Sequence, residues 1–192
     1  MARRRYYYRT RRTVPKQKWL TNMCAVNINS VSGQVTTIGN SYSYIYSTDI
    51  IRNTSNKVVS PDTTIYTNAT ILKTGRWKCK GIISSGFEAF NYLVGLMYIP
   101  EGYTITNTST TIDYQTVIYQ HPEWVLCWKR FDYTNAGQSN EFSLSSRLKR
   151  NLNSGDRVIM FLLINNSSGN PVNIVASTNL LRATVTYVCR SN

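Results

Sequence analysis

Histidine, carboxylates and nucleotide-binding glycine patterns are scarce in this sequence, and their scarcity argues against enzymatic chemistry. His121 is the single histidine and precedes Pro122 in a segment that reads as a loop. A Ser-His-Asp or Cys-His catalytic system would have to be built around it, and no neighbouring residue supports one. The nine Asp and Glu residues are scattered singly, and neither a GxGxxG nor a phosphate-loop pattern occurs. We therefore expect no catalytic residues, an exposed or partner-contacting His121, and a turn-shaping role for Asp156.

The four cysteines lack the spacing of a metal site. Cys24, Cys79, Cys127 and Cys189 include no CxxC pair and have no histidine cluster beside them. Structural zinc sites normally need closely spaced pairs of such ligands. The apolar or alternating surroundings of these cysteines predict buried free thiols rather than disulfides. We expect no metal and no other cofactor.

Long apolar segments are also absent. The apolar runs 92–99 and 158–164 are far shorter than the ~20 residues of a membrane-spanning helix. The basic N-terminus lacks the apolar stretch that follows it in a secretory signal. We expect no membrane insertion and a soluble protein that is made inside the cell.

Positive charge is plentiful, and it is concentrated at the N-terminus. The chain has 22 Lys and Arg residues against nine Asp and Glu residues, a formal net charge of +13. Residues 1–18 contain no carboxylate, so the rest of the chain carries an ordinary charge balance. The cations of this arm are Arg3, Arg4, Arg5, Arg9, Arg11, Arg12, Lys16 and Lys18, and they surround three consecutive tyrosines, Tyr6, Tyr7 and Tyr8.

The composition of this arm is typical of nucleic-acid binding. It has almost nothing to bury, so we expect it to be disordered on its own. Each phosphate that a cation neutralises releases condensed counterions, and tyrosine rings offer faces on which unpaired bases stack. Short Arg-rich segments also act as nuclear-targeting or solubilising tails, and that role is compatible with the first. The predicted organisation is a disordered basic arm, 1–18, and one folded domain, 19–192.

The folded domain reads as all-β. Stretches rich in Val, Ile, Thr, Tyr and Trp alternate with turn signals that contain Gly, Pro, Asn and Asp. Many short strands at this spacing indicate a sandwich or a barrel, and the only helical candidate is 145–151, one or two turns long. The predicted strands are 21–30, 41–46, 64–72, 76–83, 92–99, 115–119, 124–133, 141–144, 157–165 and 180–189.

Two of these strands predict which faces are buried. In 76–80, the two-residue period places Arg76, Lys78 and Lys80 on a wet, basic side and Trp77 and Cys79 on the inner side. Residues 158–164 are apolar at every position, which predicts a strand covered on both faces by the core and by a loop or neighbouring subunit.

Three segments resemble the capsid proteins of circular, Rep-encoding single-stranded DNA viruses, the circovirus-like group. They are RRRYYYRTRR at 3–12, YLVGLMYIPEG at 92–102 and FSLSSRLKRNLNSGDRVIMFLLINN at 142–166. The resemblance implies an eight-stranded jelly roll of two packed four-stranded antiparallel sheets. It also implies self-assembly of about 60 copies into a T=1 icosahedral shell.

The resemblance assigns partners as well. The arm would bind a single-stranded DNA genome inside the virion, and Arg3–Arg12 would engage the host nuclear import machinery; the host attachment factor stays unknown. The implied locations are the virion and, during assembly, the host nucleus. Arg76, Lys78 and Lys80 would form a basic track on the lumenal face or else an outer or intersubunit surface. Arg147, Lys149 and Arg150 would contact either nucleic acid or a neighbouring subunit.

Two other readings remain open. The arm would serve the capsid of a small satellite-like RNA virus equally well, because charge and stacking do not distinguish DNA from RNA. The preference for DNA rests on the resemblance of 142–166. A cellular β-barrel that binds nucleic acid, or a jelly-roll lectin with a basic tail, is the third reading. A binding barrel should interleave aromatics and cations on adjacent strands, whereas the cations here lie mostly in the arm.

Tyrosine is abundant, with 14 residues, and several fall at predicted loops or strand edges. Tyrosine is enriched at protein interfaces, so this distribution gives weak support to self-association. The residues concerned are Tyr46, Tyr66, Tyr103, Tyr114, Tyr119 and Tyr133.

Overall fold

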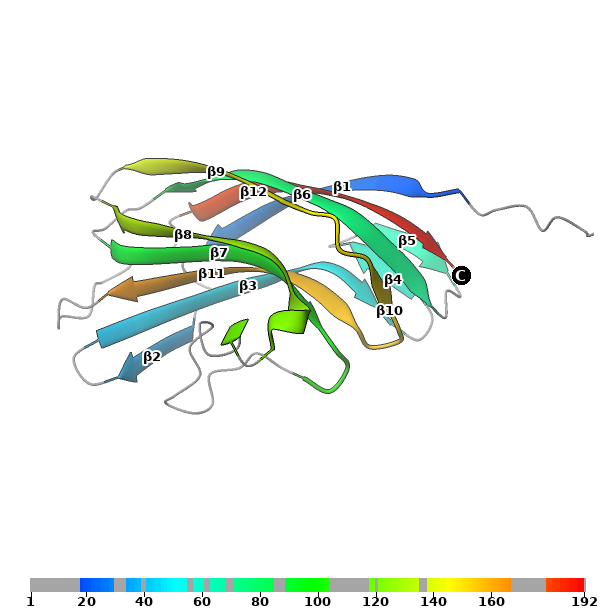
Figure 1. The fold of residues 1–192 in the computed structure, drawn as a ribbon, viewed down its shortest axis with the longest axis horizontal. Helices are drawn as coiled ribbons and strands as arrows, with labels where there is room; N and C mark the ends of the chain where they lie inside the picture. The colour runs from blue at the N-terminus through cyan, green and yellow to red at the C-terminus, as the bar shows by residue number, and fades with distance from the viewer. Residues whose placement is uncertain are drawn as a thin grey trace, which may run out of the picture.

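Two antiparallel β-sheets pack face to face in the computed structural model of the chain (Figure 1). One layer contains β1, β6, β9 and β12, and the other contains β3, β7, β8 and β11. The structure describes residues 18–29, 34–38, 41–54, 57–60, 63–67, 71–84, 89–103, 118–119, 121–134, 138–166 and 179–191.

The first sheet has five strands in the order β1-β12-β6-β10, with β9 also paired to β6. Their bounds are β1 Leu20–Asn29, β6 Leu72–Ser84, β9 Ser139–Ser146, β10 Arg150–Leu152 and β12 Asn179–Ser191. The second sheet has seven strands in the order β5-β4-β3-β11-β7-β8, with β2 also paired to β3. Their bounds are β2 Gln34–Ile38, β3 Ser41–Asn53, β4 Lys57–Ser60, β5 Thr63–Thr67, β7 Ala89–Ile99, β8 Val125–Thr134 and β11 Arg157–Asn166.

The order of the eight principal strands is that of a jelly roll. Numbered along the chain, these strands are β1, β3, β6, β7, β8, β9, β11 and β12. In one sheet the order is the first, eighth, third and sixth of these strands (β1, β12, β6, β9). In the other it is the second, seventh, fourth and fifth (β3, β11, β7, β8). Every neighbouring pair is antiparallel. The predicted eight-stranded jelly roll with two packed sheets is therefore confirmed. The short strands β2, β4, β5 and β10 extend the two sheets.

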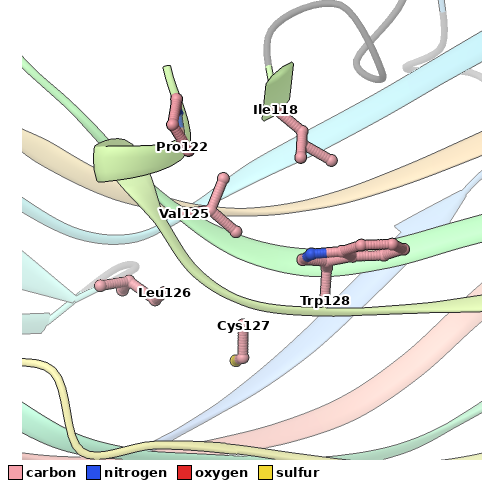
Figure 2. Close-up of a pocket in the computed structure, with 6 residues that line it drawn as sticks. All are labelled: Ile118, Pro122, Val125, Leu126, Cys127 and Trp128. Atoms are coloured by element: carbon pink, nitrogen blue, oxygen red, sulfur yellow. The ribbon is translucent and has the colours of Figure 1, made fainter. Parts of the chain in front are cut away.

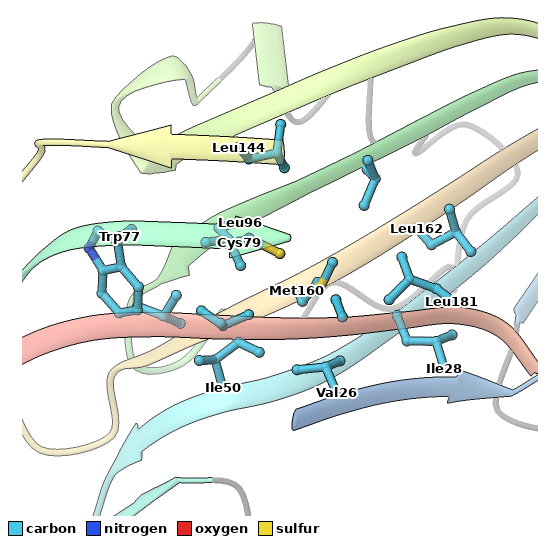
Figure 3. Close-up of a cluster of buried hydrophobic side chains, with 14 of the residues drawn as sticks. Val26, Ile28, Ile50, Trp77, Cys79, Leu96, Leu144, Met160, Leu162 and Leu181 are labelled. Carbon is cyan, nitrogen blue, oxygen red and sulfur yellow. The ribbon is translucent and has the colours of Figure 1, made fainter. Parts of the chain in front are cut away.

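The core lies between the sheets and is built by two-residue alternation. On β1, Cys24, Val26 and Ile28 are buried while the residues between them are exposed. Figure 3 shows Val26, Ile28 and Leu181 from the first sheet facing Ile50, Met160 and Leu162 from the second. Burial of this continuous apolar cluster is the main source of stability for such a sandwich.

The strand β11 is covered on both faces, as its uninterrupted apolar sequence predicts. Met160 and Leu162 lie in the core between the sheets. Phe161 and Leu163 face the other way into a second cluster, which also contains Ile118 and is packed by Trp124 and Val125. The outer cover therefore comes from this chain itself, around the 3-10 helix η2 (Pro122–Trp124).

Three local predictions are wrong. The helix expected at 145–151 is absent, because Ser145 and Ser146 end β9 while Arg150 and Asn151 begin β10 and pair with β6. Tertiary pairing has overridden local propensity there. Of the strand expected at 115–119, Ile118 and Tyr119 are helical, and residues 115–117 lie outside the described ranges. Tyr46, expected at a loop edge, is a core residue with 1% of its surface exposed.

Asp156 shapes the turn before β11, as expected. Its carboxylate accepts hydrogen bonds from the backbone N–H of Asn153 (2.7 Å) and of Glu101 (3.0 Å) and from the Tyr98 hydroxyl (2.8 Å). Gly155 beside it has a φ of 90°, a conformation that favours glycine. The pKa of Tyr98 is raised to about 12, mainly by burial and to a smaller extent by the hydrogen bond to Asp156. The network ties the end of β7 to the start of β11.

All four thiols are free in the structure, as predicted. Cys24, Cys79 and Cys189 are buried, and Cys127 is half-buried. Burial is the main cause that raises the pKa of Cys79 to about 12 and that of Cys127 to about 11. Such thiols are inert at neutral pH, because the thiolate is the reactive form.

Within the described ranges, no helix has both the length and the apolar character to cross a membrane. The same residues bring together no group of three His, Cys, Asp or Glu side chains suited to a metal ion.

Candidate nucleic-acid interface

The two sheets differ sharply in charge. The five-stranded sheet holds a single carboxylate, Glu141, against seven cations, namely Lys73, Arg76, Lys78, Lys80, Arg150, Arg182 and Arg190. In the other sheet, Asp49 and Asp132 pair with Arg157 and Arg130, at 3.6 and 2.8 Å. The seven-stranded sheet also contains Arg52, Lys57 and Lys129, so its five cations against two carboxylates give +3, compared with +6 for the five-stranded sheet.

The predicted basic face of β6 is confirmed. Arg76, Lys78 and Lys80 are exposed, whereas Trp77 and Cys79 between them are fully buried. Lys78 lies between Thr186 of β12 and Ser145 of β9, and Lys80 lies between Thr184 and Ser143. The three cations thus occupy the outer surface of the sheet, and the neighbours of Lys78 and Lys80 on either side are hydroxyl residues that do not compete for charge.

A β-bulge sets the position of Arg76. The pairing of β6 with β12 shifts between Lys78–Thr186 and Gly75–Val188, so that two residues of β6 oppose Tyr187 alone. Arg76 takes a φ of 52° there, the left-handed region that side chains other than glycine rarely adopt. The strained backbone directs Arg76 outward while Trp77 stays in the core.

A groove of about 620 Å³ lies beside these cations. It is lined by Arg76, Trp77, Lys78, Ser145, Ser146, Arg147 and Lys149. The two faces of this groove come from β6 and from the end of β9 with the segment that follows it. Among the described residues, Arg76, Lys78, Arg147 and Lys149 have no carboxylate partner. Four unopposed cations around one hollow suit a phosphate backbone.

A smaller hollow of about 100 Å³ continues this groove toward the start of β1. It is lined by Trp19, Gly75, Arg76, Lys149 and Val188, and it shares Arg76 and Lys149 with the larger groove. A Cβ atom at position 75 would lie 3.1 Å from Lys149 Cγ, so glycine leaves room for the lysine stem across β6. We call the two hollows together the basic groove.

Trp19 forms the end wall of the basic groove. It lies just before β1, where Leu20 pairs with Cys189 of β12. The Arg190 guanidinium carbon is 4.8 Å from the centroid of its ring, a cation–π contact that holds the indole against the sheet. Even so, 39% of the Trp19 surface is exposed. From the sequence, Trp19 is only the first residue of the predicted folded domain; in the structure it also lines the basic groove.

The structure locates only part of the predicted nucleic-acid site. Arg3, Arg4, Arg5, Tyr6, Tyr7, Tyr8, Arg9, Arg11, Arg12 and Lys16 lie outside the described residues, while Lys18 is exposed beside Trp19. Arg147 and Lys149 join Arg76 and Lys78 in the groove, and Lys80 lies further along the same face. Arg150 does not join them, because its side chain donates to the Glu123 carbonyl and lies 6.0 Å from the Tyr98 ring centroid.

A second hollow, of about 420 Å³, lies on the opposite sheet and is chemically different. It is lined by Ile118, Pro122, Val125, Leu126, Cys127 and Trp128. Figure 2 shows Ile118, Val125 and Trp128 on the outer side of β8, while Cys127 points toward the other sheet. None of the described residues that line this hollow is charged, so they offer phosphate no counter-charge.

His121 packs near this second hollow, in an aromatic cluster. Its ring stacks on Trp124 with centroids 3.8 Å apart, and Tyr103 meets Trp124 edge-on at 4.9 Å. His121 Nδ1 is 3.2 Å from a Glu123 carboxylate oxygen. The backbone N–H of Glu123 is the main cause that lowers the pKa of this carboxyl, and His121 contributes. The half-exposed histidine is engaged in loop packing.

Comparison with known proteins identifies no family. No protein-family model matches the chain, and no curated protein sequence matches it significantly. Two solved structures of deformed wing virus, a honeybee pathogen, align with it. One is 12% identical, covers 92% of this chain and 48% of the other, and has a TM-score of 0.27. The other, of the virus carrying the GFP gene, is 11% identical, covers 91% and 44%, and has the same TM-score.

The chain thus spans about half the length of the chains that it matches. Similarity at this level is too low to assign shared structure residue by residue, so the jelly-roll assignment rests on the strand order of the two sheets.

Proposed function

We propose that this chain is a shell-forming capsid protein that packages nucleic acid. The observation that carries the proposal is the basic groove on one outer face of a jelly roll, at the place where the Arg-rich arm joins the domain. Trp19, the last residue before β1, lines this groove, and Lys18 precedes it in the chain. A polyanion bound by the fixed cations would therefore lie next to the point where the arm joins the domain. The proposed role is structural and not enzymatic.

The assembled form that we propose is a T=1 shell around single-stranded DNA. With about 60 subunits, the arms would bring roughly 480 positive charges inside, enough to condense a short genome without reading its sequence. DNA is preferred to RNA because of the resemblance of 142–166 to circovirus-like capsids. Nuclear import through Arg3–Arg12, with assembly in the host nucleus, belongs to the same proposal.

Exposed apolar side chains support self-association. Met23 on the edge strand β1 is 73% exposed, and Trp128 on the edge strand β8 is 45% exposed. Tyr119 beside the second hollow is 77% exposed. Unpaired sheet edges that carry large apolar groups are sites where copies of a chain associate.

The test is expression of the full chain and of a variant that lacks residues 2–18. Both are purified at moderate salt and examined by negative-stain microscopy, and the extracted contents are treated with DNase or RNase. We expect uniform small particles with nucleic acid from the full chain, and a folded β domain without nucleic acid from the variant. Particles whose cargo resists DNase but not RNase would favour the RNA-virus alternative.

Two outcomes contradict the proposal. A full chain that stays monomeric across salt and pH, yet binds oligonucleotides, would point to a cellular binding module. A truncated chain that packages nucleic acid as well as the full chain does would remove the role of the arm.

A further inference from the structure

We propose that Trp19 and the basic groove form a nucleotide site that selects single-stranded over double-stranded nucleic acid. The inference rests on the proposed function and adds a ligand class to it. The phosphate would lie among Arg76, Lys78, Arg147 and Lys149, and an unpaired base would stack on the Trp19 ring.

The size of the basic groove fits one nucleotide of a single strand. Its larger part, about 620 Å³, lies within the size range of small-ligand sites. From Gly75 to Lys78 the groove follows β6 for about 10 Å, at roughly 3.3 Å per residue. Trp19 stands at the glycine end, and Lys78 belongs to the larger hollow. Stacking and phosphate contacts are therefore offered in two hollows that share Arg76 and Lys149.

Trp19 is held ready for stacking before any ligand binds. Arg190 lies over its ring at 4.8 Å, and the adjacent pairing of Leu20 with Cys189 fixes the backbone beside it. A ring that is already ordered loses little conformational freedom on binding. The guanidinium also adds positive charge next to the site, where a phosphate of the same strand would pass.

Selection for single strands follows because the faces of the bases are inaccessible in a duplex. The faces of paired bases are covered by their neighbours in the stack, so a ring at the end of a groove cannot reach them without unstacking the duplex. An unpaired base offers its face freely, and stacking on an aromatic side chain is tolerant of sequence. The cations of the groove alone would bind any polyanion, and among the described residues that line it Trp19 is the exposed ring that distinguishes among them.

The exposed Trp128 on β8 provides a matched control. It is 45% exposed against 39% for Trp19, but it lies on the other sheet beside the apolar hollow. The experiment compares full-chain Trp19→Ala, Trp19→Phe and Trp128→Ala with the wild type. Binding is measured to an oligothymidylate of about 12 nucleotides, within the site size of known single-strand binders, to a hairpin duplex and to polyphosphate.

We expect Trp19→Ala to weaken oligothymidylate binding about 10-fold, the effect of one lost base stack. Duplex and polyphosphate binding should change less than 2-fold, Trp19→Phe should retain most of the affinity, and Trp128→Ala should match the wild type. Oligothymidylate should also quench the tryptophan fluorescence of the wild type more than that of Trp19→Phe, and polyphosphate should quench neither.

Two results would overturn the inference while leaving the proposed function intact. In one, Trp19→Ala binds oligothymidylate as well as the wild type does. In the other, it loses affinity for all three polyanions equally, as expected if Trp19 only positions Arg190. A wild-type chain that binds neither nucleic acid would overturn both proposals.

Discussion

Trp77 and Tyr187 stack with their ring centroids 5.0 Å apart, at the point where β6 bulges against β12. Both residues are fully buried, and the Tyr187 hydroxyl donates to Ser60 Oγ at 2.7 Å. Because this pair anchors the bulge from below, the adjacent Arg76 is held outward at its left-handed backbone angle. The outward position of the Arg76 side chain in the groove thus depends on an aromatic contact in the core.

The strain at Arg76 predicts an unusual substitution. Arg76→Gly should stabilise the fold by about 0.5–1 kcal/mol, because glycine adopts a positive φ without the 1–2 kcal/mol that other residues lose there. Lys78→Gly, two residues along in regular strand, should instead destabilise by about 1 kcal/mol. Urea unfolding at high salt, with nucleic acid removed, measures both. Equal losses in the two variants would contradict strain at position 76.

Removing cations from the basic groove should lower the salt dependence of single-strand binding. Lys78→Gln with Lys149→Gln removes two phosphate contacts, so the slope of log K against log salt should fall by about 1.4. The matched control is Lys129→Gln with Arg130→Gln, which removes the same charge from β8 on the other sheet. Titrations at several salt concentrations give both slopes. If the control variant showed an equal decrease in the salt-dependence slope, binding would depend on net charge and not on the position of the cations.

The three hydrogen bonds that Asp156 accepts predict a large loss of stability when this residue is replaced by asparagine. Asp156→Asn places an amide N–H₂ among three donors, which should destabilise the fold by about 3 kcal/mol, since hydrogen bonds to a charged group contribute about 1.5–3 kcal/mol each. Tyr98→Phe removes one of the three donors and should cost about 1.5 kcal/mol. Thermal unfolding should resolve the two, at roughly 2–4 °C per kcal/mol. The turn model fails if Tyr98→Phe is the more damaging change.

The buried thiols predict a loss of stability at alkaline pH. The pKa of Cys79 is raised from 9.0 to about 12 in the folded chain, so between these values the unfolded chain loses a proton that the folded chain keeps. The stabilisation is complete below pH 9 and declines as pH rises, by at most about 1.4 kcal/mol per pH unit for this thiol. Cys79→Ala should show a shallower decline in urea unfolding between pH 8 and about 11. An unchanged slope would rule out this thiol as the cause.

Strand periodicity was enough to predict the faces of the sheets, but long-range pairing decided the rest. The alternation in 76–80 and the unbroken apolar run in 158–164 specify burial locally, and both predictions are confirmed. The segment 145–151 has no such local signal. Its residues form the end of β9 and the start of β10 because β6 offers them partners, and no pattern in the segment itself contains that information.

The groove could be predicted only in part for the same reason. Arg76 and Lys78 share a strand, so their period places them together. Arg147 and Lys149 reach them across sheet pairing, and Trp19 reaches them because β1 pairs with β12. The bulge that turns Arg76 outward leaves no mark in composition, since an arginine at positive φ contradicts ordinary preference.

The pairing of β1 with β12 also has a consequence for synthesis. Residues 20–29 find their strand partner in residues 179–191, which follow far later in the sequence. The five-stranded sheet therefore cannot close, and its share of the core stays open, until residues 179–191 have been synthesised. The Arg-rich segment precedes both strands in the sequence, so its charge is present throughout that interval. Premature capture of messenger RNA is thus a hazard during translation, and a slow last step of folding gives it time to occur.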